Sequence, residues 1–180
     1  MNPGDLPTGL VTVSPTNLAC ASSVLREPSV PARESSIDLQ QTVSRLRQAL
    51  ESIPYGTGLS AVQIGIPVQV AIVNMARRPD TELVIIDPEL ISISGRRTPR
   101  REGCLSLPHY KGEVVRRNKV SFKATDLTDA DYEHTAIGYR AAVIQHELDH
   151  LQGVLYWDRM APGLALSPME IEDESGPDPT

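Results

Sequence analysis

The chain has 180 residues, of which 40% are hydrophobic and 22% are charged, and its formal net charge is −6. This length fits a single compact domain, and the composition excludes a wholly disordered or fibrous protein. The apolar runs, such as residues 84–86, are too short to span a membrane, and the negative charge gives no electrostatic basis for direct binding to nucleic acid. Two cysteines, Cys20 and Cys104, are too few for a disulfide framework and favour a reducing compartment. Because the N-terminus shows no basic segment followed by an apolar one, we expect a cytoplasmic protein.

The two ends of the chain differ in composition from its middle. Five prolines between Pro3 and Pro31 favour an extended segment there over a helix or a central strand. We expect residues 1–23 to form an extended arm of a single domain that covers residues 1–166. Residues 169–180 hold five acidic residues and no basic one, so we expect residues 167–180 to form an acidic, disordered tail.

The first predicted helix follows the proline-rich segment. Ser35 or Ser36 offers an N-cap, and Asp38 completes a helix start signal with Ser35. Apolar residues then recur at spacings of four, three, four and three, which predicts the buried stripe of an amphipathic helix formed by Leu39, Val43, Leu46, Leu50 and Ile53. Pro54 and Gly56 end this helix.

The remaining elements are strands followed by one more helix. Runs of β-branched and alternating apolar residues predict strands at residues 68–74, 83–86, 114–115, 120–124 and 132–137, and Ile91 and Ile93 either continue the second of these or open another strand. Gly138 breaks this pattern, and residues 141–151 predict a second helix that Gly153 stops. The expected fold class is therefore α+β, with two principal helices packed among short, largely antiparallel strands.

A metal-binding pattern lies within the second predicted helix, at His146-Glu147-Leu148-Asp149-His150. Residues four apart lie on the same face of a helix, so both imidazoles can bind one metal ion. Glu147 lies near that face and can handle a proton from metal-bound water. The alternative is a pair of solvated histidines, but the apolar residues 141–144 indicate a buried helix. We therefore place a candidate metal site on the C-terminal helix.

A catalytic metal needs a third protein ligand and an open position for water. No histidine follows His150, which excludes a downstream site with three histidines. Cys104, between Gly103 and Pro108, is the better candidate because a thiolate is a strong ligand for a borderline-soft divalent ion. The alternatives are that Cys104 is a small buried core residue, or that a carboxylate of the tail (Glu170, Glu172 or Glu174) binds the metal instead.

A third segment of interest is rich in glycine and covers residues 56–65. It has neither the lysine of a phosphate-binding loop nor the spacing of a dinucleotide-binding loop. Glycines here would let the backbone approach a substrate closely. Gln63, a lone amide among apolar residues, would then donate to a developing negative oxygen, although an amide bonded to the local backbone is the more common role.

These three segments, in this order, resemble the motifs of the peptide deformylase family over roughly residues 24–160. The second motif is intact at residues 102–106 and the third at residues 146–150. The first motif departs from the usual pattern at two positions. Thr57 stands where an aliphatic residue is usual, and Ser60 stands where alanine is usual.

The resemblance implies removal of the formyl group from N-formylmethionyl peptides or nascent chains, with release of formate. It implies that Cys104, His146 and His150 hold one divalent metal, Fe²⁺ with Zn²⁺ or Ni²⁺ as substitutes. It also implies that Glu147 accepts a proton from water and returns it to the leaving amine. No nucleic-acid or membrane partner is expected, and we expect a monomer.

The resemblance also assigns roles around the substrate. The Gln63 amide and the Leu105 backbone N–H would stabilise the developing negative oxygen. Gly58 would bond the formylated amide of the substrate. The remaining expected substrate-binding residues are Thr57 and Gly103 and, as the apolar wall of a methionine pocket, Tyr139, Ala142 and Val143, of which the last three are as readily interpreted as ordinary core.

Three other functions compete with this interpretation. The first is a zinc endopeptidase in which the histidine pair recruits Glu170. The second is a catalytically impaired metal-binding relative, in which Thr57 and Ser60 reflect a spoiled pocket. A serine hydrolase is disfavoured because no serine lies in a nucleophile-elbow pattern.

Overall fold

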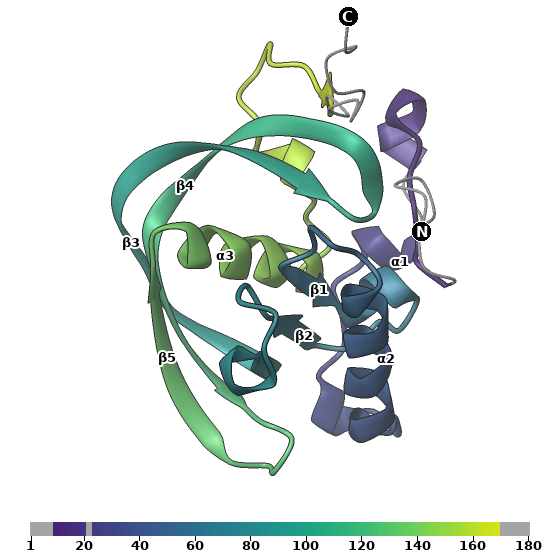
Figure 1. The fold of residues 1–180 in the computed structure, drawn as a ribbon, viewed down its shortest axis with the longest axis vertical. Helices are drawn as coiled ribbons and strands as arrows, with labels where there is room; N and C mark the ends of the chain where they lie inside the picture. The colour runs from purple at the N-terminus through teal and green to yellow at the C-terminus, as the bar shows by residue number, and fades with distance from the viewer. Residues whose placement is uncertain (1–8, 21–22, 170–180) are drawn as a thin grey trace, which may run out of the picture.

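The computed structural model of the chain describes residues 9–20 and 23–169 and confirms the α+β fold class (Figure 1). Two helices of 13 residues each, α2 (Leu39–Glu51) and α3 (Tyr139–Leu151), pack against one antiparallel sheet. The strands follow the order β1-β2-β3-β4-β5, with β6 paired to β4 at its side. They are β1 (Gly58–Ser60), β2 (Val70–Val73), β3 (Leu83–Cys104), β4 (Leu107–Thr125), β5 (Asp131–Ile137) and β6 (Ser167–Pro168).

Strands β3 and β4 are much longer than the short strands that the sequence suggested, with 22 and 19 residues. The segments expected near residues 83–86 and 91–93 join into β3, and those at 114–115 and 120–124 join into β4. Four irregularities interrupt the β3–β4 register, and such bulges bend and twist a strand pair. The hairpin therefore curves, and Figure 1 shows it arching around α3.

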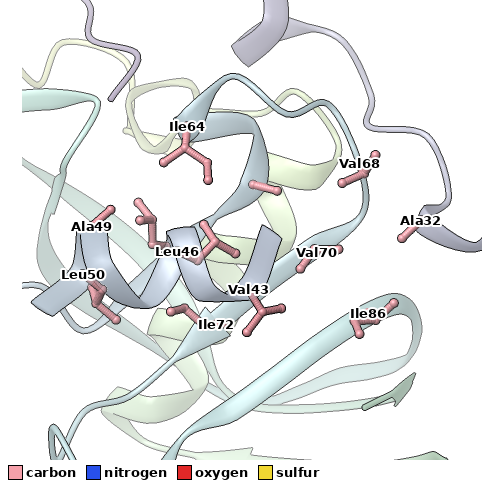
Figure 2. Close-up of a cluster of buried hydrophobic side chains, with 12 residues drawn as sticks. Ala32, Val43, Leu46, Ala49, Leu50, Ile64, Val68, Val70, Ile72 and Ile86 are labelled. Carbon is pink, nitrogen blue, oxygen red and sulfur yellow. The ribbon is translucent and has the colours of Figure 1, made fainter. Parts of the chain in front are cut away.

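Helix α2 covers the part of the sheet that carries β1 and β2. Its apolar stripe, including Val43, Leu46 and Leu50, packs on Val70 and Ile72 of β2 (Figure 2). The predicted stripe is thus confirmed, but the predicted cap is wrong. Asp38 is the N-cap and accepts a hydrogen bond from Gln41 N at 2.9 Å, whereas the Ser35 hydroxyl donates to Ala32 O.

Helix α3 lies in the interior of the molecule, on the concave side of the curved strands. Its residues Ala141 and Ile144 pack against Val120 and Phe122 of β4, together with Ala136 of β5. Eight of its 13 residues are buried, including polar ones. The metal-binding pattern is therefore carried by a core helix, as the apolar residues before His146 predicted.

The N-terminal segment is not wholly extended. Short helical segments form at Pro15–Cys20, which is kinked at Asn17, at Ser23–Arg26 (α1) and at Ala32–Glu34, although the prolines were expected to prevent helix here. Residues 1–8 of the expected arm lie outside the described residues. The arm runs beside two of the sequence motifs, because Val11 N donates to Gln63 O and Val13 N donates to Ser106 O, both at 2.7 Å.

The start of the expected tail is part of the sheet. Ser167–Pro168 form β6, paired with Tyr110 and Lys111 of β4, and Met169 N donates to His109 O. The expectation of disorder from residue 167 is therefore wrong for these three residues, because backbone pairing with β4 holds them. Residues 170–180, with Glu170, Glu172 and Glu174, lie outside the described residues. Within the described part of the chain, no helix has the length and apolarity needed to cross a membrane.

Candidate active site

Three side chains, one from β3 and two from α3, converge beside the C-terminal half of α3. Cys104 ends β3, while His146 and His150 are one turn apart on α3. Their ligand atoms all lie within 4.8 Å of one another, and Cys104 Sγ is 3.2 Å from His150 Nε2. One thiol and two imidazoles form a donor set that suits Zn²⁺ and other borderline divalent ions. The geometry of the cluster therefore fits a metal ion.

The charges around Cys104 favour its thiolate form, which is the form that can bind a metal ion. Cys104 and His150 are only 8% and 1% exposed. Burial alone would raise the pKa of Cys104, but the nearby His150 and His146 outweigh it and hold this pKa well below its usual value. A depressed pKa favours the thiolate, which is the form of cysteine that binds metals.

A buried network of charged side chains contacts the Nδ1 side of His146 and orients its ring. Its Nδ1 lies 3.1 Å from Glu102 Oε2, which leaves Nε2 directed at the cluster. Glu102 also accepts two hydrogen bonds from Arg116, at 2.7 and 2.9 Å, and Arg116 donates to Asp149 at 2.5 Å. Arg159 donates to the same Asp149. Although burial opposes ionisation, Arg116 and His146 lower the pKa of Glu102 to about 2, so this carboxylate stays charged.

Glu147 lies beside the cluster and is 3% exposed. Its Oε2 accepts a hydrogen bond from the Ser60 hydroxyl at 2.5 Å. Its Oε1 faces Gly58, where an added Cβ would lie only 2.6 Å from that oxygen. Burial raises the pKa of Glu147, against the opposing effects of His146 and His150. A buried carboxyl group with a raised pKa is suited to accept a proton and to return it.

Neighbouring groups contact both the oxygen and the nitrogen of the Gln63 side-chain amide. Its Oε1 accepts from Ser60 N at 2.9 Å, while its Nε2 lies 3.5 Å from Cys104 Sγ and 3.2 Å from Ser106 Oγ. The local backbone satisfies the oxygen, and this fixes the NH₂ group on the side of the cluster.

A cavity of about 190 Å³ opens onto these groups. Eleven of the twelve predicted site residues line it, namely Thr57, Gly58, Gln63, Gly103, Cys104, Leu105, Tyr139, Ala142, Val143, His146 and Glu147. His150 lies behind this lining and reaches the cluster from the buried side. The structure thus brings together every residue that the sequence predicted for the site.

Several residues around the cavity were missed by the sequence analysis. Ser60 contacts Glu147, Glu102 contacts His146, and Arg116 contacts Glu102 in turn, although none of the three was given a role. The rim includes Arg101 of β3 and Lys111 of β4, which pair with Glu113 and Gly103 near the turn of the β3–β4 hairpin. Ser60 carried a signal, because it departs from the usual motif. The others depend on the strand register, which the sequence does not display.

A buried thiol and two imidazoles beside a carboxyl group and an amide, all at the base of one cavity, define a site of the metallohydrolase class. The comparisons agree with this class. The profile of the polypeptide deformylase family matches residues 17–164. The cluster that we describe lies entirely within this range.

Solved structures give the same result. A peptide deformylase from Thermotoga maritima is 29% identical with a TM-score of 0.73, and the match covers 85% of this chain and 97% of that one. The enzyme from Synechococcus elongatus, solved in complex with actinonin, is 31% identical with a TM-score of 0.76, over 89% of this chain and 84% of that one. The enzyme from Arabidopsis thaliana, solved with an inhibitor, is 32% identical with a TM-score of 0.70, over 85% and 81%.

The chain belongs to the peptide deformylase family. It is therefore a metallohydrolase that removes the N-formyl group from nascent polypeptides, and the family implies a divalent metal. The comparisons do not support an endopeptidase or an impaired metal-binding relative.

Proposed function

We propose that Cys104, His146 and His150 hold one divalent metal ion and that Glu147, Gln63 and Leu105 act on the formyl group beside it. The observation that carries this proposal is the convergence of the three ligand atoms within 4.8 Å, next to Glu147 and open to the cavity. When bound there, the ion lowers the pKa of a water and polarises a carbonyl oxygen. The catalytic domain, with residues 1–23 as its N-terminal arm, extends past residue 166 to include β6, which pairs with β4.

Glu147 moves the proton in this scheme. Hydrolysis of the formamide forms one bond from water oxygen to the formyl carbon and breaks the bond from that carbon to the methionine nitrogen. Glu147 accepts the proton that the water loses and delivers it to the leaving nitrogen, so that formate and a free amine result. The hydrogen bond from Ser60 occupies Oε2, so Oε1, beside Gly58, is the atom available to the substrate.

Gln63 and Leu105 stabilise the charge that collects on the formyl oxygen during attack. The Gln63 NH₂ group lies on the cluster side, and Leu105 directly follows Cys104 and lines the same cavity. Each well-placed donor is worth about 3 kcal/mol in the transition state. Gly58 supplies a backbone partner for the amide of the substrate.

The substrate side chain occupies the apolar part of the cavity. Ala142 and Val143 are 2% and 8% exposed and line it, which supports their role as the wall of a methionine pocket. Tyr139, Thr57 and Gly103 line the more open part. Tyr139 is 51% exposed, and the Arg100 guanidinium lies 5.6 Å from the centre of its ring.

The metal is Fe²⁺, with Zn²⁺ or Ni²⁺ as substitutes, and the protein acts as a monomer in the cytoplasm on N-formylmethionyl peptides. The HExxH pattern supplies two of the ligands. A thiolate ligand gives negative charge to the ion and makes it a weaker Lewis acid than three neutral imidazoles would. The choice of Fe²⁺ rests on the resemblance to the deformylase family. Neither nucleic acid nor membrane enters this scheme.

The decisive experiment combines turnover with metal analysis. Protein loaded anaerobically with Fe²⁺ should release formate from formyl-Met-Ala-Ser, and Cys104→Ser should lose the metal or most of the activity. Cys20→Ser is the matched control, because it removes the only other cysteine. Metal-loaded wild-type protein that releases no formate would overturn the proposed function, and full metal binding by Cys104→Ser would overturn the ligand set.

A further inference from the structure

Ser60 is the one departure from the usual motif that contacts the reacting groups directly. It ends β1, is 0% exposed and does not line the cavity. Its hydroxyl lies 2.5 Å from Glu147 Oε2 and 3.3 Å from the Glu147 backbone oxygen. A hydroxyl has one proton to donate, and the shorter contact to the carboxylate is the stronger bond. No solvent competes for it at this depth.

The geometry of β1 explains how this contact fixes the carboxyl group. Residues two apart on a strand point to the same face, so Gly58 and Ser60 both face α3. Glycine leaves room for Oε1, since a Cβ at residue 58 would come within 2.6 Å of it, and serine supplies a donor to Oε2. The two oxygens of Glu147 are thereby made different, one bonded and one free.

The backbone of Ser60 makes a second, separate contact. Its N–H donates to Gln63 Oε1 at 2.9 Å. This bond survives any substitution that keeps the backbone in place. Replacement by alanine therefore removes the hydroxyl contact to Glu147 and leaves the contact to Gln63 intact.

We infer that Ser60 is a positioning residue, which anchors Glu147 Oε2 so that Oε1 faces the water and the leaving nitrogen. Alanine, usual at this position in the motif, cannot supply this hydrogen bond. In this chain the orientation of the general base therefore depends on a serine hydroxyl that touches neither substrate nor metal ligand. The inference rests on the proposed function, because it assumes that Glu147 carries the proton.

The test compares Ser60→Ala, Ser60→Thr and wild type, each loaded with Fe²⁺ and assayed with formyl-Met-Ala-Ser. We expect kcat to fall about tenfold in Ser60→Ala, a part of the ~10²–10⁴-fold that a positioned general base provides. KM, metal content and the thermal unfolding midpoint should stay close to wild type, because Ser60 contacts neither substrate nor metal. Ser60→Thr, which keeps the hydroxyl, should recover most of kcat.

A control and a structure separate positioning from packing. Thr125→Val removes another buried hydroxyl, which donates to Ile86 O at 3.3 Å far along the sheet, and should leave kcat unchanged. A crystal structure of Ser60→Ala should show the Glu147 carboxyl group rotated or in two conformers. The inference is overturned if kcat of Ser60→Ala stays within threefold of wild type, or if lost metal or stability accounts for the whole fall. It is also overturned if folded Ser60→Thr stays as slow as Ser60→Ala.

The two proposals fail in different ways. Wild-type protein without formate release would contradict the proposed function, whatever the variants do. Active wild-type protein with an equally active Ser60→Ala would contradict only the role of Ser60. If Ser60→Thr does not fold, the kcat and crystal structure of Ser60→Ala decide alone.

Discussion

The floor and the rim of the active-site cavity are held in place in different ways. The floor consists of Gln63, Cys104, His146 and Glu147, and each of these side chains has a hydrogen-bond partner. The rim includes Tyr55 and Tyr139, each of which is 51% exposed. Rigid, desolvated groups suit the bond-breaking chemistry, whereas an open rim can accept the varied remainder of a nascent chain.

This difference predicts how variants divide. Changes at the floor should affect kcat or metal binding. Changes in the Glu102–Arg116–Asp149 network that supports the floor should affect stability. Changes in the wall above it should affect KM and substrate preference. The predictions below test this division, from the largest expected effect to the smallest.

Glu147→Gln tests the floor most severely. The amide keeps the shape of the side chain but cannot take up the proton, so kcat should fall by about 10²–10⁴-fold. Formate release measures the loss, and metal content should remain at the wild-type level. Glu113→Gln, an exposed carboxylate on β4, is the matched control and should stay fully active. Activity of Glu147→Gln within tenfold of wild type would remove Glu147 from the mechanism.

Arg116→Met tests the support behind the floor. The arginine side chain is 5% exposed and bridges Glu102 and Asp149. Its loss removes the buried counter-charge between these carboxylates and leaves Glu102 with His146 and Asp149 with the half-exposed Arg159. The free energy of unfolding should fall by about 3–5 kcal/mol, measured in urea at matched metal loading. Lys123→Met removes an exposed pair with Glu133 and should cost at most about 1 kcal/mol. Equal losses in the two variants would show that the buried network is no more important than a surface pair.

Gln63→Leu removes one donor from the floor. The amide contributes to charge stabilisation in the transition state, so kcat should fall by about 10²-fold. Steady-state kinetics should show a KM close to that of wild type. A change confined to KM would mean that Gln63 binds the substrate without stabilising the developing oxyanion.

Val143→Ala tests the wall. Removing methyl groups from an apolar pocket weakens discrimination by about 10-fold or somewhat more, so KM for formyl-Met substrates should rise while kcat changes little. The comparison of formyl-Met with formyl-norleucine and formyl-Ala peptides reports the shape of the pocket. Val115→Ala, at an exposed position of β4, is the control. An unchanged KM for all three peptides would place Val143 in the core and not in the pocket.

The parts of the site that depend on local periodicity were predictable from the sequence. His146 and His150 share a helix face at any register of the surrounding sheet, and the stripe that begins at Leu39 defined α2 before any contact was known. The resemblance to the deformylase motifs then linked Cys104 and Gln63 to that helix. Because these features lie in short segments, they do not require knowledge of the tertiary structure.

The parts that depend on strand pairing were not predictable. Arg116 reaches Glu102 because β3 and β4 pair in one continuous register between Arg97 and Gly103, and a one-residue slip would turn the arginine to the opposite face. The same pairing extends the strand expected near residues 83–86, past Ile91 and Ile93, as far as Cys104. The N-cap of α2 was not predictable either. Asp38, and not Ser35, accepts a hydrogen bond from the backbone N–H of Gln41.

X-ray absorption spectroscopy at the iron edge tests the central claim most directly. We predict that Fe²⁺-loaded wild-type protein shows one sulfur and two imidazole ligands, and that Cys104→Ser loses the sulfur signal together with formate release. A spectrum without sulfur in the active wild-type protein would contradict the ligand set formed by Cys104, His146 and His150.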